Sequence, residues 1–119
     1  MSAGDTMMRL LENASAQSAE VLSPAAAWRD RAACRGLHSD LFYPPTTAEQ
    51  ERVAAQYCAE CSARFSCLAY ALTRDEMHGV WGGTSEQTRR ALRRVRRRQR
   101  ENAERIAVEA AASGRSGAA

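Results

Sequence analysis

Apolar residues recur at helical spacing along the middle of the chain, and polar or turn-forming residues separate the segments. Val53 and Tyr57 lie four residues apart, so they share one face of a helix. Thr46 and Thr47 are each followed three residues later by Glu or Gln, which is the pattern of a capping box at a helix start. We therefore predict a helix that begins after one of these threonines and ends near Tyr57.

A second apolar stripe, formed by Phe65, Leu68 and Leu72, follows Ser62. Serine is a favoured N-cap, so we predict a helix over residues 63–75. No segment has the alternating pattern of a β-strand beyond a pair that flanks a turn. The sequence therefore predicts an all-α fold, a small domain of four to five helices.

The last predicted helix covers residues 84–112, and a capping box made by Thr84 and Gln87 begins it. A turn with three glycines in five residues precedes this helix, at 79–83. Glycine and serine recur after residue 112, so we predict a disordered tail over 113–119.

The first part of the chain has weaker signals. Residues 1–22 are polar and rich in Ala and Ser, and we predict a flexible extension there, although their Met and Leu residues could form a short amphipathic helix. Ser23 and Pro24 favour a helix start, so a helix is predicted from there to about residue 33. We expect residues 23–83 to form the folded domain.

Charge is distributed unevenly along the 119 residues. Residues 86–105 contain nine Arg and three Glu, whereas the rest of the chain is net acidic. All seventeen basic residues are Arg, which a genome rich in G and C could also explain. A basic run without interleaved acidic residues favours nucleic acid as the partner, ahead of a solvated helix face or an acidic protein or membrane surface. The candidate DNA-binding residues are Arg89, Arg90, Arg93, Arg94, Arg96, Arg97, Arg98 and Arg100.

Four cysteines are the strongest chemical signal. Cys58, Cys61 and Cys67 follow the pattern C-x2-C-x5-C, and Cys34 lies 24 positions upstream. Thiolates are soft ligands that suit Zn(II) or an iron–sulfur cluster, and spacing alone leaves both open beside a disulfide or redox-thiol role. The chain lacks a second C-x2-C pair, which structural zinc sites usually have. The two histidines, His38 and His78, are predicted to be surface or turn residues.

Several motifs accompany the cysteines: Trp28, Ala33-Cys34, Asp40-Leu41-Phe42-Tyr43-Pro44, Gly79-Val80-Trp81-Gly82-Gly83 and the arginine-rich segment. Their order and spacing resemble those of the WhiB-like family of transcription regulators, over about residues 24–100. The resemblance implies a [4Fe-4S] cluster held by all four cysteines. It also implies contact with promoter DNA and with the primary sigma factor, and the residues expected at the sigma factor are Trp28, Phe42 and Trp81.

The sequence and the resemblance together predict a redox- or nitric-oxide-responsive transcription regulator in the cytoplasm, without a membrane partner, a small-molecule substrate or enzymatic activity. Within the same resemblance, the apo form with cysteine disulfides could be the state that binds DNA. Two alternatives remain open. One is a protein disulfide reductase that uses Cys58-x-x-Cys61. The other is a zinc-stabilised DNA-binding module.

Overall fold

The computed structural model describes residues 3–17 and 27–117, and these parts are mostly helical. Their sole β feature is an isolated bridge between Trp81 and Thr84. The all-α prediction is therefore confirmed. In chain order, the elements are α1 (Ala3–Ala16), η1 (Trp28–Arg31), η2 (Ser39–Phe42), α3 (Thr47–Val53), η3 (Ala54–Cys58), α4 (Arg64–Thr73) and α5 (Glu86–Gly117).

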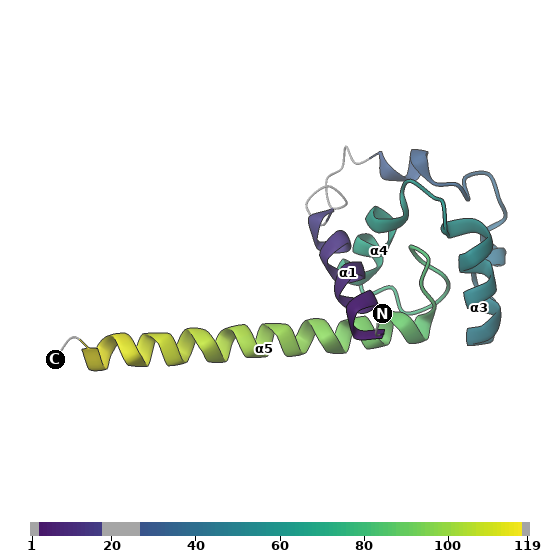
Figure 1. Ribbon diagram of the computed structural model, residues 1–119. Helices are drawn as coiled ribbons and strands as arrows, with labels where there is room; N and C mark the ends of the chain where they lie inside the picture. The colour runs from purple at the N-terminus through teal and green to yellow at the C-terminus, as the bar shows by residue number, and fades with distance from the viewer. Residues whose placement is uncertain (1–2, 18–26, 118–119) are drawn as a thin grey trace.

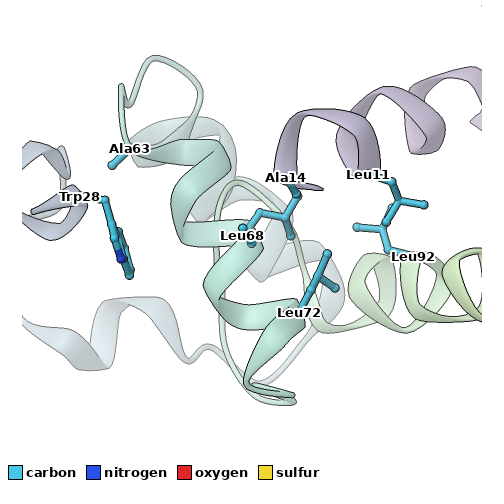
Figure 2. Packing of buried hydrophobic residues seen from close by; sticks show 8 residues of the cluster. Leu11, Ala14, Trp28, Ala63, Leu68, Leu72 and Leu92 are labelled. Atoms are coloured by element: carbon cyan, nitrogen blue, oxygen red, sulfur yellow. The ribbon is translucent and has the colours of Figure 1, made fainter. Parts of the chain in front are cut away.

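Helices α1, α4 and α5 meet in one hydrophobic core. Figure 2 shows Leu11 of α1 facing Leu92 of α5, while Leu68 and Leu72 of α4 lie beside them. Trp28 and Ala63 extend this buried cluster along α4 on the side away from α1 (Figure 2). The core is small, as expected for a chain in which alanine supplies much of the apolar content.

The N-terminal segment differs from the predicted flexible extension, because residues 3–16 form α1. Leu11 and Ala14 are 4% and 2% exposed, and they pack against α4 and α5. The small Ala14 side chain allows a close approach between helices, and the partly buried Met7 and Leu10 add to the contact of α1 with the core. The weak apolar pattern of this segment hides that docking, since the partner surface is far away in sequence.

The helix predicted to end near Tyr57 begins as expected. The Thr46 hydroxyl accepts a hydrogen bond from the Glu49 amide (3.2 Å), so Thr46 is the cap. The α-helical part ends at Val53, and one π-helical turn, η3, continues it to Cys58. Turns of this kind are often found at functional sites.

Helix α4 begins one residue later than the prediction. Ser62 does not cap it, because its hydroxyl donates to the Arg31 carbonyl oxygen (3.3 Å) and Ala63 is the N-cap. Ser62 therefore joins η1 to the start of α4. The predicted helix from Ser23 to residue 33 begins outside the described residues, and its visible end is the short 3-10 helix η1.

Helix α5 also begins later, at Glu86, and the Ser85 hydroxyl accepts from the Thr88 amide (3.1 Å). It continues to Gly117, beyond the predicted end at residue 112. Its first turns pack against the domain, and the remainder projects as a single rod (Figure 1). The structure therefore has a folded end, which carries the cysteines, and an extended end made by one helix.

Candidate metal centre

The four cysteines line one cavity of about 360 Å³. They come from separate elements: Cys34 follows η1, Cys58 ends η3, Cys61 lies in the turn after it and Cys67 lies in α4. The Cys61 amide donates to the Cys58 carbonyl oxygen (3.2 Å), so the C-x2-C segment closes a tight turn that brings both thiols to the cavity. All four side chains are half-buried free thiols.

Backbone amides face the sulfurs from two directions. Gly82 N–H donates to Cys67 Sγ (3.2 Å), and Ala33 N–H donates to Cys61 Sγ (3.3 Å). A hydrogen bond from the Gly83 backbone also reaches Cys58. Such N–H···S bonds stabilise negative charge on sulfur and are one of the ways proteins tune iron–sulfur clusters.

The glycine turn forms the wall of the cavity that supplies the Gly82 and Gly83 hydrogen bonds. Gly79, Gly82 and Gly83 all have positive φ values, a conformation that other residues rarely adopt. At Gly82 a Cβ atom would lie 2.5 Å from the Leu68 Cβ, so glycine is required there for the turn to lie against α4. The Val80 amide donates to the Phe42 carbonyl oxygen (2.7 Å), which ties the turn to η2 as well.

The buried thiols have raised pKa values. Burial raises the pKa of Cys67 to about 12, against the opposing effect of the hydrogen bond from Gly82. Burial also raises the pKa of Cys58, and the neighbouring Cys61 and Cys34 add to the effect. Both thiols are therefore protonated at neutral pH in the absence of a cation, and metal binding at this site would release protons.

Arg64 contributes an unsatisfied polar atom beside the cysteines. Its Nε is buried without a hydrogen-bond partner among the described residues, and its side chain lines the same cavity. Its positive charge lowers the pKa of Cys58, against the larger effect of burial. A buried donor of this kind favours an anionic occupant. Four soft thiols, amides that donate to sulfur and this cation together fit a negatively charged metal–thiolate centre.

The three aromatic residues expected at a sigma factor differ in exposure. Trp28 is only 3% exposed and packs against Tyr70 at a centroid distance of 5.5 Å, so it belongs to the core, although it also lines the cysteine cavity. Phe42 and Trp81 are half-buried and line the same cavity. The Trp81 ring also stacks on the Tyr70 ring, at a centroid distance of 5.7 Å.

The arginine run is divided between the inside and the outside of the protein. Arg89 is fully buried, and it donates hydrogen bonds to backbone carbonyl oxygens, so it is not available to DNA. Arg93 and Arg96 are half-buried. The exposed members of the predicted set are Arg90, Arg94, Arg97, Arg98 and Arg100. We predicted the same DNA-binding role for all eight arginines. The sequence does not show which of them are buried, because one face of α5 is buried only through contacts that are distant in sequence.

Residues 28–92 match the family described as transcription factor WhiB. This span is more than half of the chain, and it contains the four cysteines and the glycine turn. The chain belongs to the WhiB family. The resemblance stated from the sequence motifs is therefore confirmed.

Named relatives come from several actinobacteria. The chain is 40% identical over 87 residues to transcriptional regulator WhiB2 of Mycobacterium tuberculosis, a match that covers 71% of this chain and 97% of the relative. It is 41% identical over 83 residues to WhiB1 of Bifidobacterium longum, covering 66% and 90%. It is 40% identical over 68 residues to WhiB of Streptomyces coelicolor, covering 57% and 77%. The WhiB relatives are all named transcriptional regulators, which supports a role in transcription regulation.

The sequence analysis missed two features of this WhiB-family site. Arg64 was not singled out, since a lone arginine after a C-x2-C pair carries no signal of burial. An exposed apolar rim near the cavity was also missed, formed by Leu37, Leu41 and Tyr43, which are 43%, 42% and 51% exposed. The aromatic motif at residues 40–44 was the available signal for part of that rim. No helix within residues 3–17 and 27–117 is long and apolar enough to span a membrane.

Proposed function

We propose that this protein is an iron–sulfur transcription regulator that holds a [4Fe-4S] cluster through Cys34, Cys58, Cys61 and Cys67. The observation that carries the proposal is that all four thiols line a single cavity, and that backbone amides donate hydrogen bonds to two of the sulfurs. The cluster would supply a centre that reacts with oxidants or nitric oxide. The protein itself supplies the ligands, the hydrogen bonds to sulfur and the positive charge of Arg64.

The cysteine pattern favours a cluster over zinc, because the chain lacks the second C-x2-C pair that structural zinc sites usually have. Four sulfurs that line one cavity also suit a centre with several metal atoms.

Metal analysis of protein purified without oxygen tests this proposal. We expect iron and acid-labile sulfide in equal amounts, with broad visible absorption, and we expect each Cys→Ser variant to lose most of the iron. A Ser62→Ala variant is the matched control, because Ser62 lies beside Cys61 and its hydroxyl bonds to a carbonyl oxygen of η1. Stoichiometric zinc in place of iron, with a folded protein, would overturn the assignment of the cluster.

In transcription, we propose that the protein acts in the cytoplasm on promoter DNA together with the primary sigma factor. The exposed arginines of α5 supply the charge that phosphates attract. Phe42 and Trp81 remain the proposed sigma-factor contacts, and the exposed Tyr43, which lines the same cavity, enlarges that apolar surface. Trp28 supports this surface from within the core.

A direct binding measurement compares the form loaded with the iron–sulfur cluster and the iron-free form. Both forms are titrated against the sigma factor and a promoter fragment. We expect sigma-factor binding from the loaded form, which keeps the glycine turn in place. Tighter DNA binding by the iron-free, disulfide-bonded form would instead support the apo state as the DNA-binding one.

The disulfide reductase alternative is less well supported by this geometry. Cys58 and Cys61 do not stand alone as a redox pair, because Cys34 and Cys67 line the same cavity. An insulin-reduction assay on the iron-free protein tests the alternative. Activity that depends on Cys58 and Cys61 but not on Cys34 or Cys67 would favour it.

A further inference from the structure

Arg89, on the first turns of α5, is a buried cation that backbone oxygens surround. Its side chain is fully buried, and it donates to the carbonyl oxygens of Thr84 (2.8 Å), Glu76 (3.3 Å) and Gly79. It also donates to the Thr84 hydroxyl at 3.2 Å. No carboxylate forms an ion pair with it among the described residues. Burial lowers the pKa of Arg89 to about 10, so the side chain stays charged at neutral pH.

Two of the three carbonyl oxygens that Arg89 binds, those of Gly79 and Thr84, lie in or directly after the glycine turn that also faces the cysteines. Within the turn, Gly82 donates its amide to Cys67 Sγ (3.2 Å). Two backbone hydrogen bonds between Trp81 and Thr84 close the C-terminal end of the turn. One short segment thus directs amides toward the sulfurs and carbonyl oxygens toward α5.

Arg93 makes similar contacts one helical turn later. Its Nη2 donates to the carbonyl oxygens of Ala71 (3.2 Å) and Glu76 (3.0 Å), at the C-terminal end of α4. Cations are favoured at the carboxyl end of a helix, because the last carbonyl groups there lack partners. Since α4 also carries Cys67, α5 is attached through arginines to both elements on that side of the cysteine cavity.

We propose that Arg89 is a positioning residue that couples occupancy of the cysteine site to the attachment of α5, with Arg93 in support. The proposal rests on the proposed function, in which the occupant is the iron–sulfur cluster and α5 contacts DNA. The coupling is reciprocal: whatever holds α5 in place also holds the glycine turn against the sulfurs. The arginine run therefore contains two kinds of residue. Arg89 and Arg93 attach α5 to the rest of the fold, and the exposed arginines face solvent.

Hydrogen exchange on the full-length protein tests this coupling. Wild type, Arg89→Gln and the control Arg90→Gln are each compared in the loaded form and after removal of iron with a chelator. Arg90 is the exposed neighbour, so the control makes the same charge change without touching the turn. Iron and sulfide are measured first, so that an iron-free wild type would overturn the proposed function and this proposal together.

For the wild type and for Arg90→Gln, we expect amides at the start of α5 to exchange about tenfold more slowly in the loaded form, the size of effect that one buried hydrogen bond to a charged group produces. For Arg89→Gln, we expect this difference to fall below about twofold, while the amides of α3 respond as in wild type. The visible circular dichroism of the loaded form should also change, since the turn that donates to Cys67 is loosened. An iron-loaded Arg89→Gln protein with wild-type exchange and spectrum would overturn the proposal alone.

A milder variant keeps the test decisive if Arg89→Gln does not fold. Thr84→Val has nearly the same shape and removes one hydroxyl that accepts from Arg89 and donates to Trp81. We expect a change of exchange and spectrum in the same direction as for Arg89→Gln and of smaller size. A folded, loaded Thr84→Val protein without either change would count against the coupling. Arg89→Lys keeps the charge but lacks the planar fork that reaches three carbonyl oxygens, so we expect only partial rescue.

Discussion

The two ends of α5 belong to one continuous helix but have different environments. Its first turns are packed against α1, α4 and the glycine turn, and they contain the fully buried residues Arg89 and Leu92. From Gln99 to Gly114 every residue is exposed, and the helix projects alone (Figure 1). Both parts are rich in charged residues. The comparison shows that an arginine run can stabilise a fold at one end and present charge to solvent at the other.

The difference arises from partners and not from the residue type. Arg89 and Arg93 donate to backbone carbonyl oxygens in the glycine turn and in or just after the last turn of α4. Arg94 and Arg97 lie on the same helix but face away from those oxygens, toward solvent. Substitutions on the two sides should therefore change different properties, and the largest effect is expected in DNA binding.

Replacing the exposed arginines should abolish most DNA affinity without unfolding the protein. The variant changes Arg90, Arg94, Arg97, Arg98 and Arg100 to Gln. We expect promoter affinity near 0.1 M salt to fall by about a hundredfold, and the slope of log affinity against log salt to decrease by up to about four. Titrations at several salt concentrations measure both quantities. An unchanged salt slope would contradict the role of these arginines as phosphate contacts.

The next effect contrasts the docked helix α1 with the free end of α5. Leu11→Ala should lower the free energy of unfolding by about 2 kcal/mol, because Leu11 is buried between helices. Ile106→Ala is the matched control, and since Ile106 is 54% exposed we expect a change within about 0.5 kcal/mol. Urea unfolding of the iron-free proteins provides the comparison. Equal stability of the two variants would mean that α1 does not dock in solution.

A smaller effect distinguishes two adjacent arginines. Arg93→Gln should destabilise the fold by about 1.5 kcal/mol, because it removes donors from carbonyl oxygens at the end of α4. Arg94→Gln lies on the exposed side and should change stability by less than about 0.5 kcal/mol. Thermal or urea unfolding measures both. A reversed order would show that the contacts of Arg93 do not persist in solution.

The smallest effect concerns acid pH at the start of α5. Burial acts to raise the pKa of Glu86, but hydrogen bonds from Gln50 and His78 outweigh it, so the pKa lies below the usual 4.5. The carboxylate therefore adds stability above pH 4.5, and this contribution disappears as the pH falls through the lowered pKa.

The Glu86→Gln variant tests this directly. We expect it to lose about 0.5 kcal/mol of unfolding free energy at pH 6 and to match wild type at the acid end of the range. Glu101→Gln, in the exposed half of α5, is the control and should show no such pH dependence. A pH-independent difference between Glu86→Gln and wild type would remove the electrostatic explanation.

Local sequence signals predicted much of this fold. The threonine that caps α3 is Thr46, a helix forms over most of residues 63–75, and the glycine turn lies where three glycines cluster. The four cysteines were identified from their types and spacing, and the structure brings them to one cavity. These features depend on interactions between near neighbours or on residues with distinctive chemistry.

The features that sequence reasoning missed depend on contacts that are distant along the chain. The sequence pattern favours Ser62 as an N-cap, but its hydroxyl donates a hydrogen bond to the Arg31 carbonyl oxygen instead. Thr84 looks like the cap of α5, but its hydroxyl donates to the Trp81 carbonyl oxygen, and Ser85 caps the helix instead. In the sequence, Arg89 cannot be distinguished from the other basic residues, because its environment depends on its contact with the glycine turn.

The length of the basic segment limits how DNA can be recognised. Arg90 to Arg100 extend over about 15 Å at the rise of an α-helix, which corresponds to about four base pairs of duplex. So short a footprint distinguishes few sequences in a genome. Under the proposed function, promoter choice would therefore come mainly from the sigma factor, and the helix would add affinity for DNA at a promoter that the sigma factor has selected.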